Sequence, residues 1–168
     1  MWLAKLSRID GLKVLCLFFA VIAFLTYPAM ALKTVFYAED DVVINKVTGL
    51  KWARCSIGQT WSGQTCVGEV ARLSVDDALE IAKQYNDKDG TFWRLPTRAE
   101  LETLVCDSCE RPKIDIDLFP GTSAEPYWTG ESNNFVRAHN WSVNFFTGHS
   151  YGRFYPNQSL AVRLVQTF

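Results

Sequence analysis

The residues of this sequence with the clearest chemical potential are four cysteines, Cys55, Cys66, Cys106 and Cys109. Cys106 and Cys109 have the spacing of thioredoxin-like redox motifs, but those motifs open a helix, whose dipole lowers the thiol pKa, whereas this pair follows an expected helix. A four-cysteine zinc site needs two closely spaced pairs, and ten residues separate Cys55 from Cys66. Of the three possible connectivities, we expect two structural disulfides, Cys55–Cys66 and Cys106–Cys109, with no bound metal or cofactor.

Other signs of a catalytic set are sparse. The sequence has no Gly-x-Ser-x-Gly motif, and its two histidines, His139 and His149, lie in turn-rich segments without a neighbouring partner. Asp115 and Asp117 would share one face of a strand, which suits a carboxylate pair but equally an ordinary solvated face. We therefore expect a protein that is not an enzyme.

A calcium-dependent sugar site would need several oxygen ligands close together. Glu125-Pro126 begins like the sugar-binding loop of calcium lectins, but Tyr127 follows where an amide oxygen is required. Asn140-Trp141-Ser142 does not supply the second half of such a site. The sequence favours a plain loop that leads into a strand.

The polar and aromatic segment from Asn133 to Tyr155 offers the best recognition surface. Rings that stack, together with amide and guanidinium groups that donate hydrogen bonds, are the means by which proteins bind carbohydrates and peptides. Trp141 alternates with Val143 and Phe145, which favours a core position for its ring. The predicted ligand-binding residues are Asn133, Asn134, Arg137, His139, His149, Tyr151, Arg153 and Tyr155.

The stretch 93–101 is expected to organise the fold that positions these residues. Residues 93–95 alternate as in a half-buried strand, and Pro96 keeps the residue before it extended. Thr97 and Glu100 stand three apart, so hydroxyl and carboxylate can each satisfy a backbone N–H at a helix start. The stretch therefore predicts a strand that turns sharply into a short helix.

Another helix is expected after the capping residue Ser74. Its apolar side would consist of Val75, Ala78, Leu79, Ala82 and Tyr85. Between Lys113 and Pro120, three apolar residues alternate with charged ones in a strand-like run. Further strands are expected at Val35–Tyr37, Val42–Ile44, Leu50–Arg54, Tyr127–Thr129, Trp141–Phe146, Tyr151–Tyr155 and Leu160–Val165. Two helices followed by hairpins predict an α+β domain with an antiparallel sheet.

The first 31 residues have the pattern of a secretory signal peptide. Three basic residues precede an uncharged run of twelve residues, 14–25, which is the length of a signal core and short for a membrane span. Ala29-Met30-Ala31 matches the small-x-small cleavage pattern. We expect cleavage after Ala31 and a mature domain of residues 32–168 without a membrane span, located in the periplasm, at the cell surface or outside the cell. An uncleaved signal anchor is the alternative.

The composition of the expected mature chain bounds its partners. Removing residues 1–31 leaves 14 basic and 17 acidic residues, a net charge of −3. This balance, without a basic stripe, argues against a nucleic-acid partner. The full chain of 168 residues is 48% hydrophobic, which is enough to build a substantial core.

Several motifs recur together in one known family. They are Val42–Ile44 with Gly49–Trp52, Arg54–Ser56 with Gly58–Trp61 and Cys66, Trp93–Thr97, Tyr127–Thr129, and Ala161–Val165. In order and spacing they resemble the C-terminal domain family of the Legionella collagen-like (Lcl) adhesin, from about Phe36 to Gln166. The resemblance implies a C-type-lectin-like fold, related in architecture to formylglycine-generating enzymes, and a role in surface attachment through sulfated polysaccharide. This chain has no Gly-x-y run, so stalk-dependent trimerisation does not carry over, and its net negative charge argues against a strong site for sulfated glycans.

These observations favour an exported, non-enzymatic binding module that recognises a glycan or a protein in adhesion or envelope assembly. Two alternatives stay open: an enzyme of the formylglycine-generating or thiol-redox type, and a structural subunit of an envelope assembly. Four cysteines held in disulfides would leave no redox nucleophile.

Overall fold

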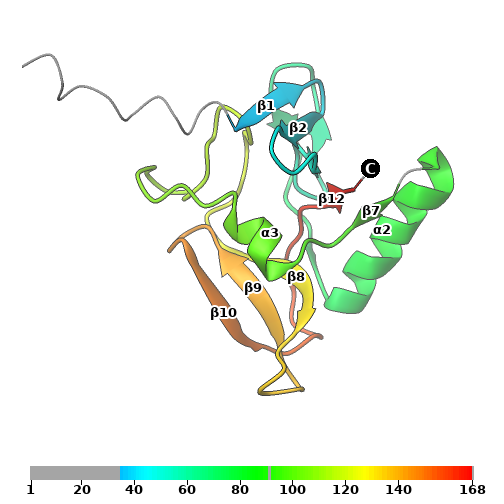
Figure 1. The fold of residues 1–168 in the computed structure, drawn as a ribbon. Coiled ribbons are helices and arrows are strands. Elements are labelled where there is room, and N and C mark those ends of the chain that lie inside the picture. The colour runs from blue at the N-terminus through cyan, green and yellow to red at the C-terminus, as the bar shows by residue number, and fades with distance from the viewer. Residues whose placement is uncertain (1–34, 91, 168) are drawn as a thin grey trace, which may run out of the picture. The chain divides into compact units, whose positions relative to one another are not determined.

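The computed structural model describes residues 35–167 except Thr91, so the expected signal peptide and its cleavage site lie outside the described residues. The described part contains two five-stranded sheets, a two-stranded ribbon and two α-helices (Figure 1). The α+β class with antiparallel sheets is confirmed. Among the described residues, no helix is both long and apolar enough to cross a bilayer.

The first sheet joins the two ends of the described chain. Its strands, in spatial order, are β1 (Phe36–Glu39), β2 (Val42–Asn45), β3 (Lys51–Ala53), β12 (Val165–Gln166) and β7 (Trp93–Arg94). All neighbours are antiparallel, and Val165 pairs with Trp52 on one side and Arg94 on the other. The C-terminal strand thus ties the N-terminal hairpin to the central stretch of the sequence.

The second sheet carries the C-terminal hairpins. Its order is β10 (His149–Phe154), β9 (Asn140–Asn144), β8 (Pro126–Ser132), β11 (Leu160–Ala161) and β6 (Arg72–Leu73). The pairs are antiparallel except β8–β11, which is parallel. The ribbon of β4 (Thr60–Trp61) and β5 (Cys66–Val67) stands apart from both sheets.

Strand β8 separates two hydrophobic cores. Successive side chains of a strand point to opposite faces, and the fully buried neighbours Tyr127 and Trp128 belong to different cores. Tyr127 packs edge-on against Phe145 at 5.1 Å, with Trp52 in the same core. Trp128 faces the core beneath α2 (Val75–Asp89) and donates its indole N–H to the carbonyl of Leu73 at 2.8 Å.

Both helices begin at the predicted caps. Ser74 accepts a hydrogen bond from the backbone N–H of Asp77 at the start of α2. Thr97 and Glu100 form a complete capping box at the start of α3 (Arg98–Glu102). The predicted apolar side of α2 is partly wrong, because Leu79 and Tyr85 are 50% and 42% exposed and the helix buries a narrower face.

Two strand predictions are wrong. Between Lys113 and Pro120 the chain forms bends and turns, because the carboxylate of Asp115 accepts the N–H groups of Asp117 and Leu118 and folds the backbone back. The expected strand Leu160–Val165 is split into β11 and β12. The residues between them bond to a loop instead, with the N–H of Ile57 donating to the carbonyl of Val162.

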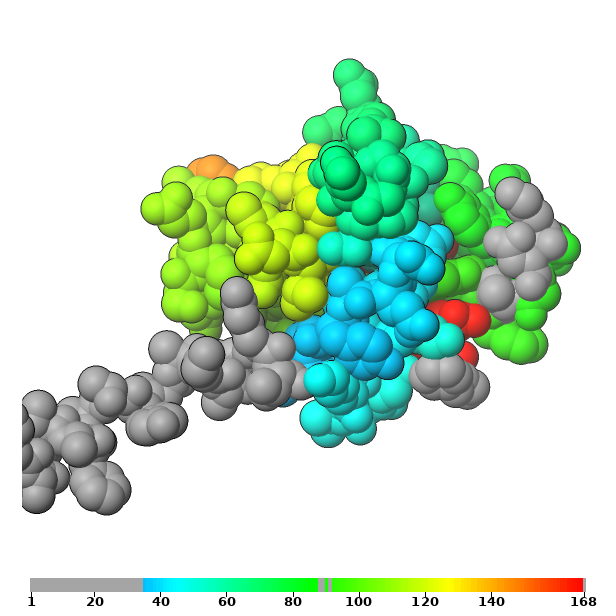
Figure 2. Space-filling model, turned by 90° about the horizontal axis from the view of Figure 1, so that it is seen from above, coloured from blue at the N-terminus to red at the C-terminus, as the bar shows by residue number. Residues whose placement is uncertain are grey.

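Both predicted disulfides are formed, Cys55–Cys66 and Cys106–Cys109. Arg54 lies beside the first of them and donates to the backbone carbonyls of Asp117 and Leu118. Figure 2 shows the result on one face, where the yellow-green segment around residue 117 lies against the blue and cyan N-terminal strands. The turns of 113–120 are therefore held by the N-terminal hairpin.

Candidate functional site

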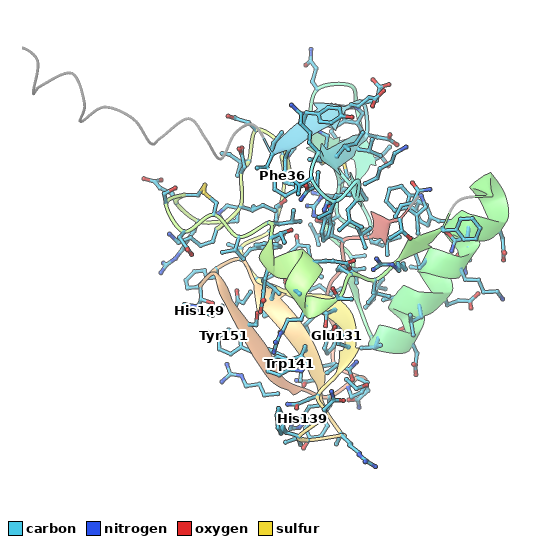
Figure 3. The ribbon with its side chains drawn as sticks, viewed as in Figure 1. Phe36, Glu131, His139, Trp141, His149 and Tyr151 are labelled. Carbon is cyan, nitrogen blue, oxygen red and sulfur yellow. A yellow bond between two sulfur atoms is a disulfide. The ribbon has the colours of Figure 1, made fainter. Side chains whose placement is uncertain are left out.

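A pocket of about 370 Å³ opens below α3, on the face of the second sheet that α3 covers. Figure 3 shows two of its residues, Glu131 and Trp141, on β8 and β9 below that helix. The full lining is Arg98, Glu131, Ser132, Asn134, Phe135 and Trp141. The pocket thus draws on one helix, two strands and the loop that joins them.

The pocket lies where both neighbours of β9 lose register. On β8, Trp128 pairs with Ser142 and Ser132 with Asn140, so three residues of β8 lie opposite Trp141. On β10, two residues lie opposite it, because Tyr151 pairs with Ser142 and Phe154 with Asn140. Bulges of this kind redirect side chains and occur next to functional sites. Here they open room around Trp141 at the end of the sheet.

The corner between β7 and α3 places Arg98. The capping box fixes the start of the helix, and the backbone N–H of Gly130 donates to the carbonyl of Pro96 at 2.8 Å. This bond ties the corner to β8 one residue before Glu131. The ion pair of Arg94 with Glu100, 2.7 Å between Nη2 and Oε1, holds the corner from the other side and keeps the pKa of Glu100 below its usual value.

Trp141 is half-buried and is held between α3 and β10. The guanidinium carbon of Arg98 lies 4.3 Å from the centre of its ring. Gly152 lies against the same ring so closely that an added Cβ would be 3.0 Å from Cδ2 and Cε2. The indole therefore forms one wall of the pocket. It is less buried than the core position that strand alternation predicts, and less exposed than a ring that is free to stack on a ligand.

The neighbours of Arg98 orient its side chain but do not use all of its hydrogen-bond donors. Its Nε lies 3.4 Å from Oε1 of Glu102, an ion pair without hydrogen-bond geometry. Glu102 in turn accepts a hydrogen bond from the hydroxyl of Ser150 at 2.5 Å. Within the described part of the chain, the two terminal guanidinium nitrogens of Arg98 make no hydrogen bond. They remain available as a fork of parallel donors.

The loop after β8 is held by Asn133. Its side-chain nitrogen donates to the carbonyl of Gly152 at 2.7 Å, and its oxygen accepts from the N–H groups of Phe135 and Val136. This arrangement presents Phe135 at the rim of the pocket with 93% of its surface exposed. Its neighbour Val136 is 46% exposed, so the loop carries a small apolar surface beside the pocket.

The eight predicted ligand-binding residues do not form one cluster. Asn134 lines the pocket, and Asn133 is buried beneath it as the support of the loop. His139 packs edge-on against Tyr155 at 4.5 Å near the tip of the hairpin, where Figure 3 shows it. Arg137 is an exposed residue of the loop between Asn133 and His139.

The other predicted residues lie along β10. Arg153 covers the ring of Tyr151 at 4.7 Å. His149 is exposed at the start of this strand, away from His139 at the tip (Figure 3). His149 and Tyr151 pair with Asn144 and Ser142, so their side chains lie on the sheet face opposite that of Trp141, and neither they nor Arg153 line the pocket.

Five lining residues were not among the predicted site residues: Arg98, Glu131, Ser132, Phe135 and Trp141. Arg98 could have been suspected, because it is the first residue after a cap at a sharp strand-to-helix corner. Nothing in the local sequence indicates that it meets Trp141, 43 positions further along the chain.

The groups considered for catalysis and metal binding are engaged elsewhere or isolated. Glu125 of the lectin-like tripeptide is bound through both oxygens by Arg72, at 2.8 and 3.0 Å. Neither His139 nor His149 forms a side-chain hydrogen bond to any described residue. Residues 35–90 and 92–167 contain no group of three or more His, Cys, Asp or Glu side chains placed to hold a metal ion.

The fold and the pocket define a class: a small α+β domain, stabilised by two disulfides, with a mixed polar and aromatic pocket at one end of a sheet. The sequence profile of the Lcl C-terminal domain matches residues 41–166, and the chain belongs to that family. The family is associated with an adhesin, and disulfides persist in the periplasm or outside the cell. A search of curated proteins finds no match.

Proposed function

We propose that this protein is an exported, non-enzymatic binding module that recognises a glycan or a protein ligand through the pocket below α3. The observation that carries the proposal is the combination of Arg98, fixed against Trp141 with donors to spare, and Phe135, held in solvent at the rim. Such a combination of an apolar anchor and a few oriented polar groups is typical of ligand sites. Membership of an adhesin-associated family supports the same role.

The C-type-lectin-like architecture is part of this proposal. Support comes from the first sheet, where the C-terminal strand β12 lies between strands from earlier in the chain. This closure leaves the second sheet and its hairpin tip as a separate, exposed end. We place ligand recognition at that end, with Arg137 of the loop after β8 as a flanking contact.

The test is a glycan array together with a pull-down on cell-surface extracts, using the oxidised mature protein. Arg98→Ala and Phe135→Ala are expected to weaken binding of any selected ligand at least tenfold, because each removes a pocket contact from an exposed position. Val47→Ser is the matched control, since Val47 is 79% exposed on another hairpin. Failure of both screens to select a ligand, or equal binding by all variants, would overturn the proposal.

A further inference from the structure

Two opposite charges line the pocket without neutralising each other. Arg98 has free terminal nitrogens, and the carboxylate of Glu131 has no ion-pair or hydrogen-bond partner among the residues that the structure describes. Arg98 and Glu131 also form no ion pair with each other in the described part of the structure. A small pocket that is lined by one cation and one anion from different elements can bind a ligand that carries an anionic and a cationic group at two separate points.

We propose that the pocket binds a zwitterion of the amino-acid class, as a free amino acid or as a short peptide with free ends. The carboxylate of the ligand accepts two hydrogen bonds from the terminal nitrogens of Arg98, which match it in geometry. The ammonium group of the ligand pairs with Glu131. An apolar ligand side chain packs against Phe135, whose ring is otherwise in water. This inference rests on the proposed function, because it assigns a class of ligand to the same pocket.

The charge balance separates a zwitterion from a polyanion. Glu102 and Glu131 bring two negative charges to the surroundings of Arg98, so a ligand with several anionic groups would meet net repulsion. A zwitterion meets each pocket charge with its opposite. Ser132 and Asn134 add a hydroxyl and an amide that can bond to the peptide group of a dipeptide.

The shape of the pocket separates a zwitterion from a neutral sugar. Sugar recognition usually uses an open aromatic face, and Arg98 and Gly152 both press against the ring of Trp141. A volume of about 370 Å³ is at the small end for ligand pockets and suits an amino acid or dipeptide.

The experiment titrates the mature protein with leucine, leucyl-leucine, N-acetyl-leucyl-leucine and leucyl-leucine amide, followed by NMR chemical shifts or calorimetry. Blocking either end is expected to weaken binding at least tenfold. Binding of leucine itself would identify a free amino acid as the ligand, and binding of leucyl-leucine alone would identify a peptide. Both results support the zwitterion.

Charge-matched variants test which residue meets which end. Arg98→Gln is expected to weaken leucyl-leucine at least tenfold and to make the protein indifferent to the amide block. Glu131→Gln should do the same for the N-acetyl block. Lys83→Gln, which removes an exposed positive charge on α2 outside the pocket, is the control and should bind like the parent.

Two results would overturn the inference: dissociation constants weaker than about 1 mM for both zwitterions, or blocked ligands that bind as well as the free ones. Either result leaves the proposed function standing if the array or pull-down ligand still depends on Arg98 and Phe135. Loss of that dependence would remove the proposed function separately.

Discussion

Nη2 of Arg163 donates a hydrogen bond to the hydroxyl of Thr122 at 2.7 Å, and both residues are buried. The same guanidinium donates to the hydroxyl of Ser56 and the carbonyl of Ala53, and lies 4.8 Å from the ring centre of Phe119. Its hydrogen-bond acceptors are neutral. Burial lowers the pKa of Arg163 to about 10, so the side chain stays protonated at neutral pH. One arginine therefore joins its own segment to two distant ones, 53–56 and 119–122, at the centre of the domain.

Replacing Arg163 is expected to destabilise the protein strongly. Arg163→Met leaves several buried acceptors without a donor, which should lower the free energy of unfolding by about 3 kcal/mol or more. Arg163→Lys keeps the charge but not the planar fork, so its loss should be intermediate. Urea unfolding at neutral pH measures both. A methionine variant as stable as the parent would show that these hydrogen bonds contribute nothing net.

The stability that comes from Glu100 should depend on pH. The ion pair with Arg94 holds the pKa of Glu100 below its usual value, so the stabilisation is complete above the usual value and disappears as the pH falls through the lowered one. Glu100→Gln can retain the capping hydrogen bond through its amide oxygen, but it removes the charge and one of the two hydrogen bonds that Glu100 accepts from Arg94. We expect a loss of roughly 1 kcal/mol at pH 7, since Arg94 is partly exposed.

The measurement for Glu100 is urea unfolding of parent and variant at several pH values. The difference between the two proteins should shrink as the pH is lowered from about 5 to about 2. A difference that stays constant over this range would assign the effect to packing and not to charge.

Much of the fold could be predicted because its signals are local. The N-cap at Ser74, the capping box at Thr97 and the proline after Leu95 each act within a few residues of themselves. The run from Lys113 to Pro120 was wrongly predicted to be a strand, because the side chain of Asp115 competes for the backbone N–H groups that a strand would need.

The site was harder to predict because it depends on register. Trp141 meets Arg98 at the point where β8 and β10 both bulge opposite it, and strand alternation along β9 carries no sign of either bulge. Asn133 was expected to bind a ligand, but its amide group forms hydrogen bonds to the backbone that hold the loop. The sequence of a loop does not show whether a polar side chain faces a ligand or bonds to the backbone.

The two disulfides should differ in what they contribute. Cys55–Cys66 closes a longer loop than Cys106–Cys109, with sequence separations of 11 and 3. Because the entropy removed from the unfolded chain grows with loop length, replacing the first pair by serine should cost about 3 kcal/mol and the second about 2 kcal/mol.

Unfolding under non-reducing conditions tests the order of these two losses. Titration of the native mature protein with a thiol reagent should also find all four cysteines blocked. Reactive thiols at Cys106 and Cys109 would revive the thiol-redox alternative, since thiolates are the reactive species.

Gly152 is expected to be essential for the shape of the pocket. An alanine Cβ there would lie 2.7 Å from the side-chain nitrogen of Asn133 and 3.0 Å from two atoms of Trp141. Both neighbours must shift, which breaks the bond that holds the loop and should lower stability by about 1–3 kcal/mol. Gly130→Ala is the matched control on β8, where the nearest atom would be 3.4 Å away. Tryptophan fluorescence and urea unfolding report the two effects, and ligand binding should fall with Gly152→Ala alone. If both alanine variants bind and unfold like the parent, the indole does not depend on the glycine, and Trp141 is free to move away from Arg98.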